Sequence, residues 1–141
     1  MPKLLSLYLR QQTLNFCPML EIGLTYTSRT TVTADNTAAT LGSGDMNVFA
    51  TPAMVALMEN AAMLCVASHL PEGNTTEGSR MDTTHVKPSA LGATVEATAE
   101  LTEVDGRKLT FHVSAREGDK LIGEGTHVRY VVDRERFLAK L

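Results

Sequence analysis

The sequence contains little cysteine, no excess of positive charge and only short apolar runs near its start. Its 141 residues include two cysteines, Cys17 and Cys65, which are too few for a disulfide framework and are typical of a reduced, cytoplasmic protein. The formal net charge is −3, which argues against a general nucleic-acid surface or an anionic-membrane surface. The run Leu4 to Leu9 is too short to cross a bilayer. We therefore expect no nucleic-acid partner and no membrane partner.

No metal-ligand spacing and no glycine-rich phosphate loop is present, so we expect neither a metal nor a cofactor. With 43% hydrophobic residues, a chain of this length suits one compact domain. Residues 1–18 differ from the rest and are interpreted as an extension, either disordered or loosely docked, with Met19 as a candidate start. The predicted single domain covers residues 19–141.

The segment Val48 to Leu70 predicts a long helix that is apolar on almost every side. Thr51 suits the N-cap and Pro52 the first helical position, while a polar loop over residues 71–79 follows the helix. A helix of this kind must be covered by other elements, so we expect it at the centre of the domain.

Two-residue alternation of apolar and polar side chains predicts strands over most of the remaining chain. The expected strands cover residues 24–33, 79–88, 94–104, 108–115 and 121–132, with a loop over residues 34–47. The order is one strand, the helix and then four strands in a meander. An antiparallel sheet of about five strands wrapped around one long helix is an α+β architecture known as the hotdog fold. Its exposed edges favour a homodimer, with a tetramer left open.

One acidic residue, Glu59, lies in the middle of the apolar helix. An ionised carboxylate without a partner in such a place costs several kcal/mol. Glu59 therefore contacts a cation, accepts hydrogen bonds or borders a cleft, where it could act as a general base. The alternative is that Glu59 reaches an exposed strip or forms a structural ion pair, and the pattern alone does not choose between the two.

Two further residues are candidates only in combination with Glu59. His85 in DTTHVKP is by itself typical of a half-exposed strand histidine or a core histidine with satisfied hydrogen bonds. Thr51 as an N-cap has a structural role already. In the functional interpretation, a helix N-terminus offers free N–H groups to an oxyanion, so the residues at 51 to 53 polarise a carbonyl group.

Three segments of the sequence resemble the fluoroacetyl-CoA thioesterase type of the hotdog superfamily. They are VFATPAMVALME at the helix start, TTHVKPSALGATVEATAELTEVDGRKLTFHVSA in the middle strands, and IGEGTHVRYVV in the last strand. Each motif is loose, but together they occur in the right order. The resemblance implies an acyl-CoA thioesterase that hydrolyses a small acyl-CoA to the free acid and CoA.

The family's catalytic threonine, glutamate and histidine fall on Thr51, Glu59 and His85. In the implied mechanism, Thr51 and the helix N-terminus hold the thioester carbonyl. Glu59 either attacks the carbonyl or activates a water molecule, and His85 orients the reacting group and protonates the leaving thiolate. Thr51 and Glu59 are roughly 12 Å apart along a regular helix. Either Thr51 lies on a loop folded back over the site, or the partner subunit supplies one of the groups.

The resemblance also implies substrate-binding positions. Pro52 and Ala53 accompany Thr51 at the helix N-terminus, Gly78 matches a glycine that contacts the thioester, and Arg129 in GTHVR lies near the site. His127 in the same motif has no such support and is interpreted as structural.

Two other functions remain open. A non-catalytic module could bind acyl-CoA without turning it over, and a hotdog hydratase or dehydratase could use Asp82 with His85. The acyl group is also open. The family's founding enzyme has a longer segment before the helix, with aromatic lid residues linked to its fluorinated substrate, whereas ATLGSGDMN here has no aromatic residue.

Overall fold

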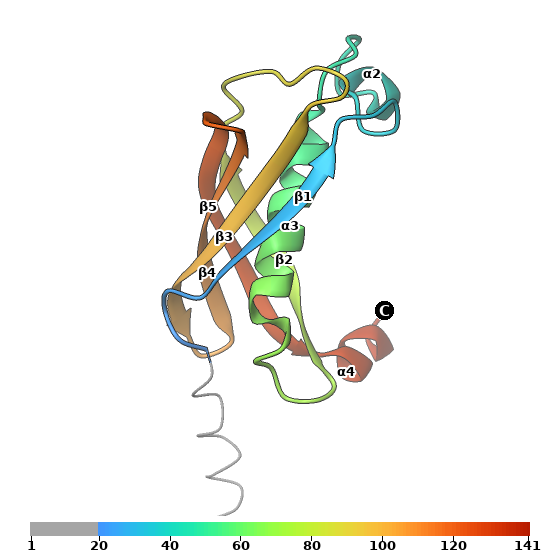
Figure 1. Cartoon of the computed structure of the whole chain (residues 1–141). Coiled ribbons are helices and arrows are strands. Elements are labelled where there is room, and N and C mark those ends of the chain that lie inside the picture. Colours follow the sequence, from blue (N-terminus) through green and yellow to red (C-terminus); the bar gives the residue numbers. More distant parts are fainter. Residues whose placement is uncertain (1–19) are drawn as a thin grey trace, which may run out of the picture.

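The computed structural model describes residues 20–141, so the predictions made for residues 1–18 and Cys17 lie outside the described part of the chain (Figure 1). Five strands and three helices follow one another along the described residues. They are β1 (Thr25–Thr31), α2 (Ala38–Leu41), α3 (Thr51–Ala67), β2 (Asn74–Thr83), β3 (Thr94–Asp105), β4 (Lys108–Glu117), β5 (Lys120–Asp133) and α4 (Arg134–Ala139).

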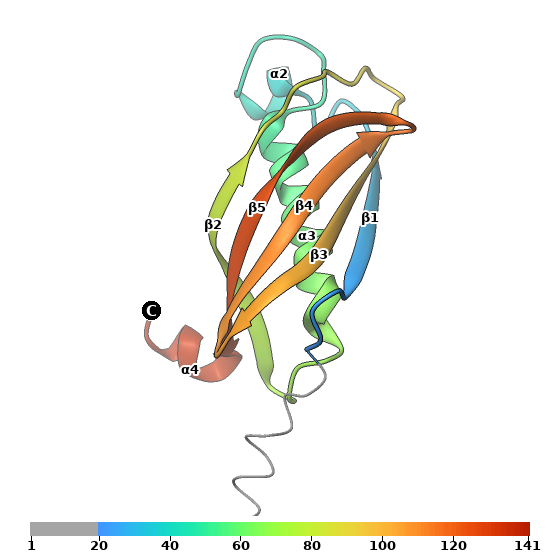
Figure 2. The same ribbon diagram turned by 90° about the vertical axis from the view of Figure 1, so that its left-hand side faces the viewer.

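The long helix α3 lies against one face of the sheet, as its apolar sequence predicts (Figure 2). Its buried side includes Met54, Met58 and Val66, none of which is exposed to solvent. Leu64, Ala56 and Ala67 lie on the outer side, where the helix is not covered by the described residues. Within residues 20–141, no helix is long and apolar enough to span a membrane.

The five strands form one antiparallel sheet in the order β1-β3-β4-β5-β2. The predicted meander is correct only for β3, β4 and β5. The strand after the helix, β2, pairs with β5 instead of β3, so it forms one edge of the sheet while β1 forms the other. Both edge strands therefore have an unpaired side within the described chain.

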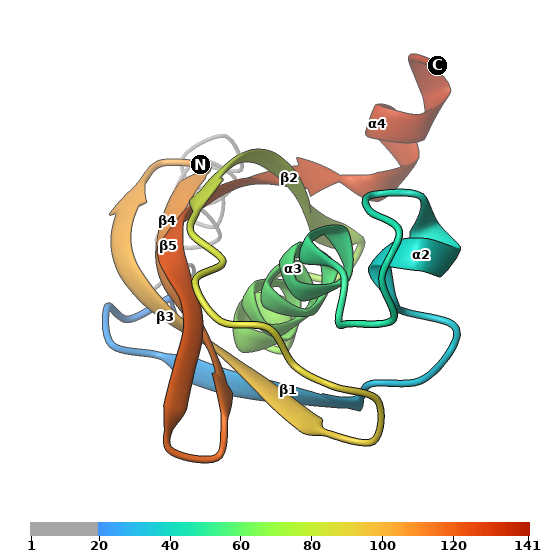
Figure 3. The same ribbon diagram turned by 90° about the horizontal axis from the view of Figure 1, so that it is seen from above.

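The sheet curls around α3, as the view along the helix shows (Figure 3). Small residues allow α3 to pack close to the sheet. Ala97, Ala99 and Ala115 line the buried face of β3 and β4 without any solvent exposure. Larger side chains such as Phe111 and Leu101 belong to the same core. The curvature places the first and middle turns of α3 next to β2 and the segment that follows it.

The structure differs from the sequence-based prediction around β2. Residues 74–79, predicted as loop, begin the strand, and the strand ends at Thr83 rather than near Pro88. The pairing of β2 with β5 shifts by one residue between Gly78 and Arg80. Such a bulge bends a strand and redirects its side chains, and bulges are frequent next to active sites.

Candidate functional site

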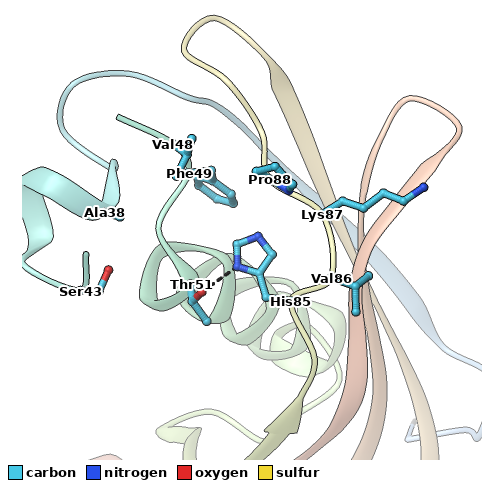
Figure 4. A pocket seen from close by; sticks show the side chains of 9 residues that line it. All are labelled: Ala38, Ser43, Val48, Phe49, Thr51, His85, Val86, Lys87 and Pro88. Atoms are coloured by element: carbon cyan, nitrogen blue, oxygen red, sulfur yellow. Dashed lines mark hydrogen bonds between the residues drawn. The ribbon is translucent and has the colours of Figure 1, made fainter. Parts of the chain in front are cut away.

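Thr51 and His85 meet at the beginning of α3. The Thr51 hydroxyl lies 2.7 Å from Nδ1 of His85 (Figure 4). The predicted N-cap role of Thr51 is wrong, since Ala50 occupies the N-cap and Thr51 is the first residue of the helix. The hydroxyl is consequently free to contact the imidazole, and the next residues, exposed Pro52 and half-buried Ala53, continue the first turn.

His85 is held by hydrogen bonds that extend the β2–β5 pairing beyond the end of β2. The amide of Thr84 donates to the Glu124 carbonyl over 3.0 Å, and the amide of Val86 donates to the Ile122 carbonyl over 2.7 Å. Between these two carbonyls lies Gly123, where an added Cβ would overlap the Thr84 carbonyl and lie 2.9 Å from Met54. The backbone on both sides of His85 is therefore fixed.

The His85 imidazole is neutral at neutral pH. Burial lowers its pKa from the ordinary value of 6.5, and the nearby backbone of Lys87 opposes this effect in part. Its Nε2 atom is buried and has no hydrogen-bond partner among the described residues. A neutral imidazole can accept a proton, so this side chain suits acid–base chemistry.

The Thr51–His85 pair forms part of the wall of a cavity of about 270 Å³. The cavity lies between α2, the start of α3 and the segment after β2, and Figure 4 shows Phe49 and Pro88 beside the histidine ring. The first N–H groups of any helix lack acceptors within the helix, so the beginning of α3 supplies donors near this cavity. Lys87 also lines the cavity, and its side chain extends away from the His85 ring.

Glu59 belongs to a second cluster, in the middle of α3. Its Oε2 atom lies 3.5 Å from Nη1 of Arg129, and its side chain remains 42% exposed. Gly78 on β2 faces the same carboxylate, because a Cβ added there would lie 2.7 Å from Oε2. Glu59 therefore has a cationic partner and an open side, which answers why an acid is found in this helix.

Arg129 is buried and anchored independently of Glu59. Its Nε donates to the Thr76 hydroxyl over 2.8 Å, and its Nη2 donates to the Thr76 carbonyl over 3.0 Å. Burial lowers the pKa of Arg129 from its ordinary value, and the nearby Glu59 carboxylate opposes that change. An arginine stays charged at neutral pH even so, which keeps a positive charge beside Glu59.

Within one chain, the predicted catalytic residues thus form two separate clusters. Thr51 is a helical residue, so the alternative in which it lies on a loop folded back over Glu59 is wrong. Eight residues of helix separate the two side chains, or roughly 12 Å along the axis. Gly78 and Arg129 lie with Glu59, whereas Pro52 and Ala53 lie with Thr51.

Sequence reasoning missed His127, which is 1% exposed and contacts Arg129. The two-residue spacing of His127 and Arg129 in a strand, which places both side chains on one face, could have indicated this contact. Among residues 20–141, no group of three His, Cys, Asp or Glu side chains is placed to hold a metal ion.

The family of fluoroacetyl-CoA-specific thioesterases matches residues 32–135 of the chain. The chain belongs to this family. The fluoroacetyl-CoA thioesterase of Streptantibioticus cattleyicolor is 45% identical over 94 residues, which cover 67% of this chain and 68% of that protein. This membership confirms the prediction that the protein is a thioesterase.

Solved structures show the same fold. A structure of the fluoroacetyl-CoA thioesterase is 37% identical with a TM-score of 0.80, covering 86% of this thioesterase and 94% of that chain. A thioesterase superfamily member from Thermus thermophilus is 26% identical with a TM-score of 0.79, covering 86% and 90%. A hot-dog-like protein from Thermanaerovibrio acidaminovorans, 22% identical, has a TM-score of 0.80 and covers 89% and 93%. The predicted hotdog fold is confirmed.

Proposed function

We propose that this thioesterase hydrolyses a small acyl-CoA to the free acid and CoA, using Thr51, Glu59 and His85. The observation that carries the proposal is the hydrogen bond between Thr51 and His85 in the wall of a cavity at a helix N-terminus. Solved structures of the related fluoroacetyl-CoA thioesterase include complexes with fluoroacetate and CoA and with acetyl-CoA. The substrate class is carried over from those complexes.

In the proposed reaction, the thioester carbonyl oxygen lies at the start of α3. The Thr51 hydroxyl and the N–H groups of the first turn, that of Ala53 among them, stabilise the negative charge that develops on this oxygen. Pro52 has no N–H, so it shapes the turn without donating. Cleavage of the carbon–sulfur bond releases the CoA thiolate, and His85 relays to it a proton that comes from the water consumed in the hydrolysis.

Glu59 supplies the nucleophile in one of two ways. Its carboxylate attacks the carbonyl carbon and forms a mixed anhydride that water then hydrolyses, or it removes a proton from the attacking water. The open side over Gly78 gives either the substrate or the water access to the carboxylate. The Arg129 guanidinium places a positive charge 3.5 Å from this carboxylate.

We further propose that two subunits complete each site. The strand β2 is a sheet edge, and edge strands are commonly protected by pairing. Antiparallel pairing of two β2 strands centred between Met81 and Asp82 would place His85 of one subunit opposite the partner subunit's Gly78. Because Gly78 borders Glu59, this register would join the two clusters that lie apart within one chain.

The cavity favours a short acyl group. Ala38 and Ser43 from the segment around α2 line it, and Phe49 is its one aromatic residue. A cavity of about 270 Å³ leaves room for a small acyl group with part of the CoA arm. Lys87, which also lines the cavity, is a candidate contact for a CoA phosphate, whereas the Arg129 guanidinium is already bound to Thr76.

The remaining predictions on cellular context stay proposals. A buried free thiol at Cys65 agrees with a reducing, cytoplasmic location. The net charge of −3 gives no reason to expect nucleic acid as a partner. The proposed reaction needs no cofactor or metal, since CoA is part of the substrate.

A binding module and a hydratase are the alternatives. The exposed Asp82 does not contact His85, whose ring bonds to Thr51, so the arrangement supports a hydratase poorly. The test is thiol release from acetyl- to octanoyl-CoA, phenylacetyl-CoA and fluoroacetyl-CoA, alongside hydration of crotonyl-CoA. Wild type should release thiol, most rapidly from a short acyl-CoA, and should not hydrate crotonyl-CoA.

Glu59→Gln should reduce thiol release by about 10²-fold to 10⁴-fold, as loss of a positioned acid–base or nucleophilic group does. Glu100→Gln, a change at an exposed residue of β3, is the matched control and should retain activity. If wild type binds acyl-CoA, as a raised melting temperature would show, but turns none over, the binding module is correct and the proposal is wrong.

A further inference from the structure

Arg129 has an unassigned buried neighbour, His127, two residues before it on β5. The Nε2 atom of His127 lies 3.2 Å from Nη1 of Arg129, and its Nδ1 lies 2.7 Å from the Arg80 carbonyl oxygen. The imidazole is 1% exposed and also lies 6.2 Å from the ring of Phe111, centroid to centroid. Both ring nitrogens thus have a partner within the protein.

These two partners determine the protonation state of the ring. A carbonyl oxygen can only accept, so Nδ1 of His127 carries a hydrogen and donates it to Arg80. A guanidinium nitrogen can only donate, so Nε2 carries no hydrogen and accepts from Arg129. A protonated imidazole would direct an N–H group at the N–H groups of Arg129, next to a second positive charge.

The His127 contact holds the third nitrogen of the Arg129 guanidinium. Nε and Nη2 of Arg129 are fixed by Thr76, while Nη1 is shared between His127 and the Glu59 carboxylate. The contact with Glu59, at 3.5 Å, is longer than the contact with His127, at 3.2 Å. The carboxylate is also the more exposed of the two groups, so His127 is the rigid partner of Nη1.

We propose that His127 is a positioning residue of this thioesterase, a neutral imidazole with its hydrogen on Nδ1 that holds the Arg129 guanidinium beside Glu59. The inference rests on the proposed role of Glu59 in catalysis. His127 does not touch the reacting atoms and acts through Arg129. The direction of the pKa agrees with this state, because burial lowers the pKa of His127 and the Arg129 charge lowers it further, against the opposing effects of the Arg80 carbonyl and the Glu59 charge.

Two substitutions separate positioning from packing. His127→Gln can place an amide oxygen near the position of Nε2 and accept from Arg129, whereas His127→Asn keeps a donor near Nδ1 but does not reach Arg129. We expect His127→Asn to lower kcat by about 10-fold to 100-fold, as loss of precise alignment does, with KM within about 3-fold of wild type. His127→Gln should restore most of kcat.

The measurement is steady-state thiol release by the full chain, with the melting temperature of each variant recorded. Equal loss of kcat in both variants, or wild-type kcat in His127→Asn, would overturn the proposal. A purely structural histidine would lower the melting temperature in both variants and leave kcat per folded enzyme unchanged.

The ring state is tested without activity by nitrogen-15 NMR of the wild-type protein. Nδ1 should carry the hydrogen and Nε2 should stay unprotonated over about pH 6 to 8, the range in which an ordinary histidine titrates. Protonation of Nε2 in this range would overturn the proposal. If wild type hydrolysed no acyl-CoA, the proposed function would fail, while this spectrum would still decide the state of His127.

Discussion

At the scale of single residues, Glu59 illustrates how an apolar helix can carry a carboxylate. Its charge faces Arg129 at 3.5 Å, and its other side borders Gly78, which has no side chain to cover it. The ion pair is only partly buried, since the glutamate side chain is 42% exposed. The pair therefore contributes little to folding stability on its own, and its value lies in presenting a charged carboxylate at an accessible position.

Half-buried His85 and buried His127 predict how stability depends on pH. Burial lowers the pKa of both His85 and His127 in the folded protein below the ordinary value of 6.5. As the pH falls below about 6.5, the unfolded chain takes up protons that the folded chain does not, so the free energy of unfolding decreases. The stabilisation is present above that pH and is lost as the pH falls through the lowered pKa values.

We expect the melting temperature to fall between about pH 7.5 and pH 5.5, and His127→Gln to make this fall smaller because one of the two groups is removed. Thermal denaturation of wild type and the variant at both pH values checks this. The matched control is His69→Gln, a change just after the end of α3. A melting temperature that rose towards acid pH would contradict the assignment.

The sequence predicted residue types better than residue contacts. Thr51, Glu59 and His85 were proposed from the resemblance, and the apolar helix drew attention to Glu59 without it. His127 was missed because one of its two partners is a main-chain carbonyl, and the distance to that carbonyl depends on the bulge in β2. No side-chain pattern in the sequence records such a contact.

At the scale of elements, the glycines of β5 decide where His85 lies. A Cβ at Gly125 would overlap the Asp82 carbonyl, and a Cβ at Gly123 would overlap the Thr84 carbonyl. Both glycines thus allow β5 to approach the end of β2 and the segment carrying His85. The two glycines in IGEGTHVR thus help to position His85, which lies almost forty residues earlier in the chain.

Gly123→Ala should push this segment away from β5 and from Met54, because the added methyl group has no room. We expect the free energy of unfolding to fall by about 1–3 kcal/mol, the usual cost of overpacking, and kcat to fall with it. Denaturant unfolding and thiol release measure the two effects. Glu100→Gln, at an exposed position of β3, is the control, and equal effects of the two substitutions would contradict this account.

Strongly patterned elements were predicted well and polar ones were not. β3 and β4 alternate regularly, so their bounds were found to within about two residues. The start of β2, NTTEGS, is polar and resembles a loop because it forms a sheet edge with little to bury. Its pairing with β5 instead of β3 is a matter of topology, and alternation alone carries no information about which strand is the neighbour.

At the scale of the whole molecule, one subunit holds two incomplete clusters at different levels of the same helix. The Thr51 hydroxyl and the His85 imidazole meet at the first turn of α3, and Glu59 with Arg129 lies two turns further on. A rigid helix cannot bring them together. Pairing of two β2 edges in opposite directions would do so, and it would make the dimer necessary for activity.

Subunit complementation tests this central claim most directly. Glu59→Gln and His85→Asn are each expected to be inactive alone, and the two chains are co-expressed with different tags and purified as a mixture. If the site combines His85 of one subunit with Glu59 of the other, random assortment should restore about a quarter of wild-type thiol release, because half of the dimers contain one intact site. Mixed dimers, isolated through both tags, that show no more activity than either parent would mean that each site lies within one subunit and would contradict the account.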